Sequence, residues 1–303
     1  MSDQIDYFNE LPDLSRYIDD LDRLSRLDLK DSNLREIERE FFKYARFQPQ
    51  SYGQMAAEDL NKLKLFRVRL NVDPENENVY LHSTFSYPPA AFCSDNGRAN
   101  IKKRSVFYGS ESADTAILES KPKPGDSGVL SIWRPIVDRE IRYSIFMSNK
   151  TDKENIFFKL ANELKEYQMQ QTLKFSACKF EHLNYLNEFI SGLLESAIPP
   201  YALSSWICDR IMYNTMPVDC IIYSSSFNSR FSNLALHPNF VDQHLRLDRV
   251  IQFVVYENSA YGLYYQLGLT GIPSWGNMEW RKLREEELKD LSEIMNGIVI
   301  FPD

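Results

Sequence analysis

The hydrophobic period changes along this chain of 303 residues, and the change limits the folds that it can adopt. Between residues 12 and 46, apolar residues recur every three or four positions with charged residues between them, which is typical of amphipathic helices. A break at residues 31–33 (DSN) divides this segment into two helices. From residue 65 on, short alternating or continuous apolar segments indicate strands separated by turns. The chain therefore combines both kinds of element.

Strands and helices alternate irregularly through the rest of the chain. Strands are expected at residues 65–70, 79–82, 105–108, 128–133, 143–146, 218–223 and 250–256. Helices are expected at residues 54–64, 114–120, 151–171, 180–197, 201–213 and 279–295. The regular βαβ rhythm of a parallel sheet is missing, so we predict an α+β fold. Residues 1–62 are expected to form an N-terminal helical module, and residues 63–303 the main domain, with a helical insertion near 150–198.

The charge is acidic and uneven. The chain carries 43 Asp+Glu against 35 Lys+Arg, a net charge of -8, and residues 1–60 contribute 14 acidic and 8 basic residues to it. This balance argues against a protein that binds nucleic acid through bulk charge. Apolar runs are shorter than the roughly 18 residues of a membrane span. The acidic start resembles no signal peptide, and the four cysteines form no CxxC pair, so a reduced cytoplasmic protein is expected.

Several common catalytic motifs are missing from the sequence. It contains no GxGxxG, GxxxxGK[ST], HExxH or GxSxG, which removes the central residues of dinucleotide folds, kinases, metalloproteases and hydrolases. His237 and His244 lie seven positions apart, but Pro238 interrupts a helix between them. We therefore expect no metal site.

A basic segment stands out against the acidic background. Residues 97–104 (GRANIKKR) hold four basic and no acidic residues. A guanidinium such as that of Arg98 can hold a pyrophosphate through two hydrogen bonds, although a solvated loop would give the same pattern. Arg69 alternates with apolar residues on an expected strand, and it is either a second phosphate contact or part of an exposed strand face.

This segment belongs to an ordered set of motifs that resembles the RES domain family, over roughly residues 63–250. The matching pieces are, in order, residues 66–69 (FRVR), 97–100 (GRAN), 108–110 (YGS), 116–119 (AILE), and 223–225 (YSS) followed by Asn233. Ser224 stands where the family usually has proline, so the family serine is Ser224, Ser225 or Ser226, and we favour Ser225.

The resemblance implies an NAD-consuming toxin with a fold like that of ADP-ribosyltransferases, in which helices flank a mixed β-sheet. Such an enzyme cleaves the bond between nicotinamide and ribose, by hydrolysis or phosphorolysis, and depletes NAD. An ADP-ribosyltransferase that modifies a protein target is an alternative, and a non-catalytic module that binds NAD or ADP-ribose is a further one. The family also implies an antitoxin partner. The sequence leaves a homo-oligomer open, and NAD is expected as a substrate, without a separate cofactor.

The site residues follow from the resemblance and from the chemistry of NAD. Cleavage builds positive charge on the ribose, and a carboxylate stabilises it, so Glu119 is predicted as catalytic together with Arg98 and Tyr108. The predicted substrate-binding residues are Arg69, Tyr80, Ser225 and Asn233. Ser225 lacks a neighbouring histidine base, so we predict that it orients the substrate and is not a nucleophile.

Overall fold

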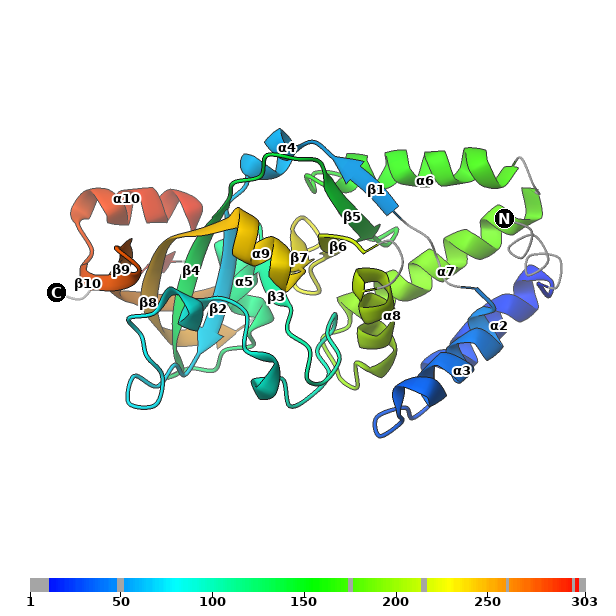
Figure 1. Ribbon diagram of the computed structural model, residues 1–303, viewed down its shortest axis with the longest axis horizontal. Coiled ribbons are helices and arrows are strands. Elements are labelled where there is room, and N and C mark those ends of the chain that lie inside the picture. Colours follow the sequence, from blue (N-terminus) through cyan, green and yellow to red (C-terminus); the bar gives the residue numbers. More distant parts are fainter. Residues whose placement is uncertain are drawn as a thin grey trace. The chain divides into compact units, whose positions relative to one another are not determined.

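The computed structural model describes residues 11–47, 52–173, 177–213, 217–259, 262–295 and 298–299. It contains helices and a mixed sheet, which confirms the predicted α+β class (Figure 1). The α-helices are α2 (Leu14–Ser25), α3 (Leu34–Ala45), α4 (Ala57–Asn61), α5 (Ala113–Glu119), α6 (Phe158–Leu173), α7 (Ala177–Glu195), α8 (Ala202–Tyr213), α9 (Pro238–His244) and α10 (Glu285–Ile294). Short 3₁₀ helices are η1 (His82–Phe85) and η2 (Ala90–Phe92). The strands are β1 (Tyr52–Met55), β2 (Leu65–Leu70), β3 (Phe107–Ser110), β4 (Ser127–Pro135), β5 (Ile141–Phe146), β6 (Cys220–Ser224), β7 (Ser232–Leu236), β8 (Leu245–Ser259), β9 (Gly262–Ser274), β10 (Asn277–Lys282) and β11 (Ile298–Val299).

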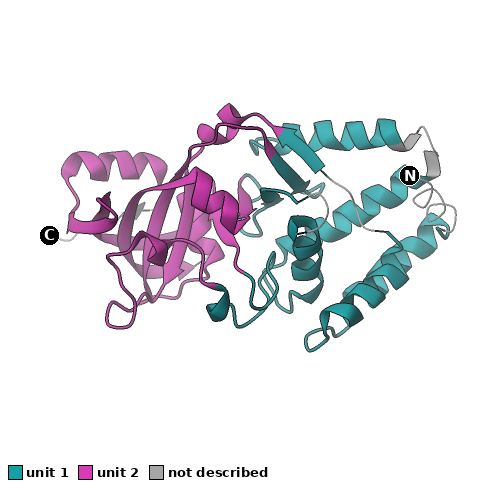
Figure 2. Ribbon diagram, viewed as in Figure 1, with its two compact units in different colours: residues 1–54, 90–104, 142–230 teal, residues 55–89, 105–141, 231–303 magenta. Residues whose placement is uncertain are grey.

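The chain divides into two compact units (Figure 2). Unit 1 consists of the described residues within 1–54, 90–104 and 142–230, and unit 2 of those within 55–89, 105–141 and 231–303. The N-terminal helices thus group with the segment of α6, α7 and α8. The division of the chain at residue 62 stays a prediction.

Unit 1 is mainly helical. Helix α2 packs on α3 and α7, and α3 packs on α8, where the rings of Phe41 and Trp206 lie 5.0 Å apart. Helices α2 and α3 start at polar caps: Asp13 Oδ1 accepts from the Arg16 amide at 3.0 Å, and Asn33 forms a capping box with Glu36. Strands β5 and β6 run parallel beside these helices.

Unit 2 is built on a sheet with the strand order β7-β3-β2-β4-β8-β9-β10. Neighbouring strands in this order are antiparallel, and β11 pairs with β9 in parallel. The alternation of apolar and polar residues on β2 gives the sheet two different faces. Phe66 and Val68 belong to the apolar face, while Arg67 and Arg69 lie on the opposite one.

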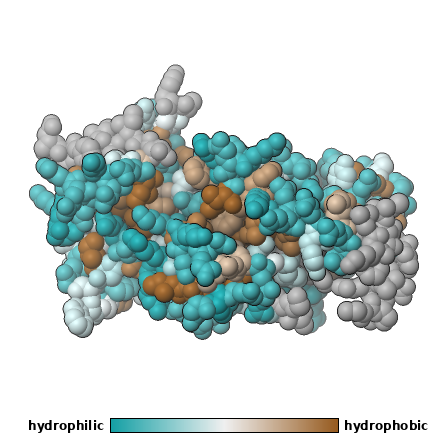
Figure 3. All heavy atoms as spheres, turned by 90° about the horizontal axis from the view of Figure 1, so that it is seen from above, coloured by the Kyte–Doolittle hydropathy of each residue, from teal (hydrophilic) through white to brown (hydrophobic). Residues whose placement is uncertain are grey.

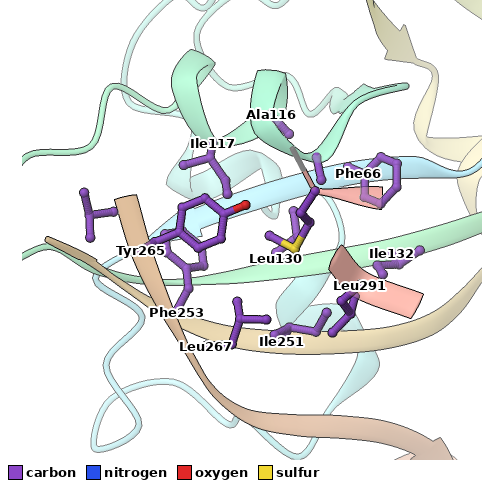
Figure 4. Packing of buried hydrophobic residues seen from close by; sticks show 13 residues of the cluster. Phe66, Ala116, Ile117, Leu130, Ile132, Ile251, Phe253, Tyr265, Leu267 and Leu291 are labelled. Atoms are coloured by element: carbon purple, nitrogen blue, oxygen red, sulfur yellow. The ribbon is translucent and has the colours of Figure 1, made fainter. Parts of the chain in front are cut away.

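Helices α5 and α10 cover the apolar face. Ile117 of α5 and Leu291 of α10 are buried against Leu130, Ile251 and other strand residues of one cluster (Figure 4). Burying an aliphatic side chain of this size stabilises a fold by roughly 1.5–3 kcal/mol. The cluster therefore fixes α5, the helix that ends in Glu119, on the sheet.

Four sequence-based predictions of secondary structure are wrong in whole or in part. The helix expected at 151–171 begins only at Phe158. The helix expected at 54–64 is strand β1 followed by the shorter α4, and the strand expected at 79–82 is a single bridge of Leu81 to Asn277 before η1. The helix expected at 279–295 begins at Glu285. Before it, Met278 is buried between exposed neighbours, which is the period of a strand, and residues 277–282 form β10.

Hydrophilic side chains dominate the described surface on the face drawn in Figure 3, with hydrophobic side chains in separate small groups. Within the described residues, no helix has the length and apolar character needed to cross a bilayer.

Candidate active site

Glu119 and Asn233 meet in unit 2. Glu119 is the last residue of α5, and Asn233 is on β7, opposite Ser110 of β3. The side-chain Nδ2 of Asn233 donates a hydrogen bond to Oε1 of Glu119 over 2.8 Å. A hydrogen bond to an ionised group is stronger than one between neutral groups and favours the ionised form. The structure thus joins two predicted site residues and holds the carboxyl group of Glu119 in one orientation.

The other end of α5 is fixed as well. Ser112 caps the helix by accepting from the amide of Thr115 at 3.3 Å. The hydroxyl of the buried Tyr265 donates to Oδ1 of Asp114 over 2.9 Å, which ties the first turn of α5 to β9. Burial raises the pKa of the Tyr265 phenol, so this hydroxyl keeps its proton at neutral pH. Glu119 therefore projects from a helix anchored at both ends.

Tyr108 shares a face of the sheet with Asn233. Successive side chains alternate along a strand, and residues opposite each other in neighbouring strands share a face. Ser110 lies opposite both Phe66 and Asn233, and Tyr108 is two positions from Ser110 on β3. Tyr108 is half-buried there. Its ring is thus on the side of the sheet that carries α5.

Arg69 and Tyr80 lie elsewhere in unit 2. The guanidinium of Arg69 donates to the Thr84 carbonyl and to Oε2 of Glu77, both at 2.5 Å. Arg69 is on the face of the sheet opposite the core cluster, so it holds the loop that leads to η1. Tyr80 is 59% exposed, and its carbonyl accepts from the amide of Met278 on β10. The contacts of Arg69 and Tyr80 are therefore with these residues, whereas Asn233 contacts Glu119.

Arg98 belongs to unit 1, in a loop with well-defined turns. The Gly97 amide donates to the carbonyl of Asn100 over 2.9 Å, and the Lys102 amide donates to Oδ1 of Asn96 over 2.8 Å. Arg98 is half-buried, between the half-buried Gly97 and the buried Ala99. Arg104, the last basic residue of the segment, pairs with Asp209 over 3.0 Å, so its charge is locally balanced.

Ser225 follows directly after β6 in unit 1. Its Oγ accepts from the amide of Phe227 over 3.1 Å, which makes the turn after the strand. The preceding Ser224 is buried, and its Oγ lies 2.6 Å from Oγ1 of Thr151. Ser224 is thus engaged in the interior, whereas Ser225 shapes the loop at the strand end.

Two polar residues of unit 2, Arg67 and Glu111, contact the backbone of β3 or β7 but were not among the predicted site residues. Arg67 donates to the carbonyl of Tyr108 at 3.3 Å and to that of Ser86 at 2.9 Å, which holds the backbone on which Tyr108 sits. Oε1 of Glu111 accepts from the amide of Ser232 at 3.0 Å. Desolvation by burial raises the pKa of the Glu111 carboxyl to about 7. The available sequence signal was weak: an acidic residue just before the N-cap of α5.

Metal-binding geometry is not found within the described ranges, where no three His, Cys, Asp or Glu residues cluster in a way that could hold an ion. Cys208 and Cys220 are buried, and burial raises the pKa of both thiols. These two thiols are therefore protonated and unreactive at neutral pH.

Comparison with known protein families gives one match. A family model described as the RES domain covers residues 64–254, which include β2, α5 and β7. The chain belongs to the RES domain family. A search of curated proteins found no match to the chain. RES domains are generally associated with enzymes that act on NAD, and the RES match includes both Glu119 and Asn233.

Proposed function

We propose that this RES protein consumes NAD by cleaving the bond between nicotinamide and ribose. Family membership supports NAD as the substrate. The observation that carries the proposal is the carboxyl group of Glu119, held by Asn233 over 2.8 Å on an anchored helix. A carboxylate fixed before the reaction stabilises charge that develops in the transition state more than it stabilises the ground state.

The chemistry gives Glu119 a defined task. When the bond breaks, its electron pair stays with the ring nitrogen of nicotinamide, which becomes neutral, and positive charge spreads over C1′ and the ring oxygen of the ribose. The carboxylate of Glu119 stabilises this charge or holds a ribose hydroxyl. An oxygen of water or phosphate then forms a bond to C1′ and loses a proton. The products are nicotinamide and either ADP-ribose or its 1-phosphate.

Other residues complete the proposal. Tyr108, on the same sheet face as Asn233, is proposed to stack on a ring of the substrate. Arg98 and Ser225 belong to unit 1, and their roles in holding pyrophosphate and orienting the substrate stay predictions from the family resemblance. The acceptor (water, phosphate or a protein side chain), NAD depletion in cells, the antitoxin and the cytoplasmic location also stay predictions.

The test is to incubate the purified full chain with NAD and identify the products by chromatography. Parallel reactions contain no phosphate, phosphate, or a cell lysate as a source of target proteins. We expect release of nicotinamide, with ADP-ribose or its 1-phosphate identifying the acceptor. Labelled protein without free ADP-ribose would indicate the transferase instead.

Variants connect the activity to the site. Glu119→Gln and Arg98→Ala should each lower nicotinamide release by about a hundredfold or more, which corresponds to about 3 kcal/mol. Glu166→Gln and Arg35→Ala, at exposed positions on α6 and α3, are matched controls and should keep full activity. Full activity of a folded Glu119→Gln variant, or tight NAD binding by the wild type without nicotinamide release, would contradict the proposal.

A further inference from the structure

Glu111 makes two hydrogen bonds to the main chain of Ser232. Its Oε1 accepts from the Ser232 amide over 3.0 Å, and its own amide donates to the Ser232 carbonyl over 3.4 Å. The hydroxyl of Ser110 donates to the same carbonyl over 3.1 Å. Both polar groups of the Ser232 backbone are therefore bound by two consecutive residues, Ser110 at the end of β3 and Glu111 directly after it.

The next residue after Ser232 is Asn233, which binds Glu119. Asn233 lies opposite Ser110 in the pairing of β3 with β7, and its side chain donates to Oε1 of Glu119 over 2.8 Å. A continuous series of polar contacts thus runs from Glu111 through the Ser232 backbone and Asn233 to Glu119. All four residues belong to unit 2.

The arrangement is costly for stability. Oε2 of Glu111 is buried and makes no hydrogen bond to any of the described residues. Leaving a polar atom buried without a partner costs roughly 1–3 kcal/mol. Burial also raises the pKa of this carboxyl to about 7, which means that the fold disfavours its ionised form. A buried carboxyl with one unpaired oxygen does not stabilise the fold in the way an apolar residue would, so a role in function accounts for it better.

We propose that Glu111 is a positioning residue for the NAD reaction, because it fixes the Ser232 backbone and so aims the Asn233 amide at Glu119. This inference rests on the proposed function, with Glu119 as the group that faces the ribose. Glu111 acts through its Oε1 as a hydrogen-bond acceptor. A glutamine can supply the same acceptor, whereas an alanine cannot.

The first test does not depend on activity. The side-chain amide of Asn233 is followed by NMR in the ¹⁵N-labelled full chain, and its signals are assigned by their absence from Asn233→Ala. We expect Glu111→Ala to shift these signals, because the amide loses its orientation toward Glu119. Glu111→Gln should leave them close to their wild-type positions.

A matched control separates orientation from general loss of stability. Glu195 in unit 1 holds Ser148 in a similar way, with its Oε1 accepting from the amide at 3.4 Å and its Oε2 from the hydroxyl at 3.1 Å. Glu195→Ala should lower the thermal midpoint without moving the Asn233 signals. The inference is overturned if Glu111→Ala leaves these signals in place, or if Glu195→Ala moves them equally.

Kinetics supply the second test. Glu111→Ala should lower kcat for nicotinamide release by about tenfold while KM for NAD changes by less than about twofold, because orientation of Glu119 matters most in the transition state. Glu111→Gln should restore most of kcat. In an Asn233→Ala background, Glu111→Ala should have little further effect, because the contact that it orients is already gone.

The outcomes separate the two proposals. A wild-type chain that releases no nicotinamide contradicts the proposed function, while the NMR test still decides whether Glu111 orients Asn233. If the wild type is active but Glu111→Ala lowers kcat equally in the wild-type and Asn233→Ala backgrounds, the positioning role of Glu111 is contradicted. The proposed function then stands.

Discussion

The side-chain amide of Asn233 donates to Oε1 of Glu119 over 2.8 Å, although 114 positions separate the two residues in the sequence. The contact depends on two features of unit 2. Helix α5 carries Glu119 as its last residue, and the pairing of β3 with β7 places Asn233 opposite Ser110 on the sheet face that α5 covers. This relationship sets the first prediction.

Replacing Asn233 should change both the rate and its pH dependence. Asn233→Ala removes a hydrogen bond to a charged group, worth about 1.5–3 kcal/mol, and should lower kcat/KM for NAD about tenfold to a hundredfold. Asn233→Asp places a second carboxylate beside Glu119, which raises the pKa of Glu119 because like charges disfavour ionisation. The acidic limb of the kcat/KM profile should therefore move to higher pH.

The control for this prediction is Asn162→Asp, an exposed position on α6. This variant adds the same negative charge at a position distant from Glu119 in the sequence. The pH profile of kcat/KM should therefore stay unchanged. An acidic limb that stays at the wild-type pH in Asn233→Asp would show that Glu119 does not control it.

Local patterns predicted much of the fold because they follow from burial on one face of an element. The three- and four-residue period over α2 and α3 and the apolar run of β6 belong to this kind. The start of β10 was mistaken for helix because its charged residues run on into the acidic first turn of α10. Charge alone does not distinguish an edge strand from an exposed helix.

The candidate site was predictable only in part, for a physical reason. Glu119 and Asn233 were found through the ordered motifs of the family, but the hydrogen bond that joins them arises from strand pairing between distant segments. Arg67 and Arg69 both alternate with apolar residues on β2. This pattern does not reveal that the guanidinium of Arg69 is bound by Glu77 and Thr84. Glu111 acts on a backbone amide, and a backbone group leaves no sequence signal.

The contact between Tyr265 and Asp114 should contribute to stability. Tyr265→Phe keeps the ring in the core and removes the hydroxyl that binds Oδ1 of Asp114 at 2.9 Å. We expect the free energy of unfolding at pH 7 to fall by about 1–3 kcal/mol, as measured by urea denaturation. Tyr256→Phe, on the exposed part of β8, is the matched control and should change it by less than about 0.5 kcal/mol. Equal effects of the two variants would show that the buried hydroxyl of Tyr265 contributes no more to the free energy of unfolding than the exposed hydroxyl of Tyr256.

The ion pair of Glu287 should make the free energy of unfolding depend on pH. Arg281 donates to both of its carboxylate oxygens, at 2.7 and 2.6 Å, and these bonds lower its pKa from 4.5 to about 2. A lowered pKa means that the contribution is present above pH 4.5 and is lost as the pH falls from 4.5 toward 2. The shift sets an upper limit of about 3 kcal/mol.

Urea denaturation between pH 7 and pH 3 checks this prediction. Glu287→Gln should be less stable than the wild type at pH 7, and the difference should shrink as the pH falls. Glu286→Gln changes a neighbouring side chain that is 76% exposed, so it should follow the wild-type curve. A constant difference between Glu287→Gln and the wild type at every pH would rule out the ion pair as its cause.

The turn between β9 and β10 offers a prediction about backbone conformation. Trp275 is fully exposed, and both turn residues have positive φ, 45° at Trp275 and 90° at Gly276. Such a two-residue turn favours Asn-Gly, while a bulky residue is strained at its first position. Trp275→Asn should therefore raise the free energy of unfolding by about 0.5–1 kcal/mol. Trp275→Val should lower it, since a β-branched residue tolerates positive φ least. Because both variants remove the same exposed ring, the difference between them in urea denaturation isolates the backbone preference, and equal stabilities would refute it.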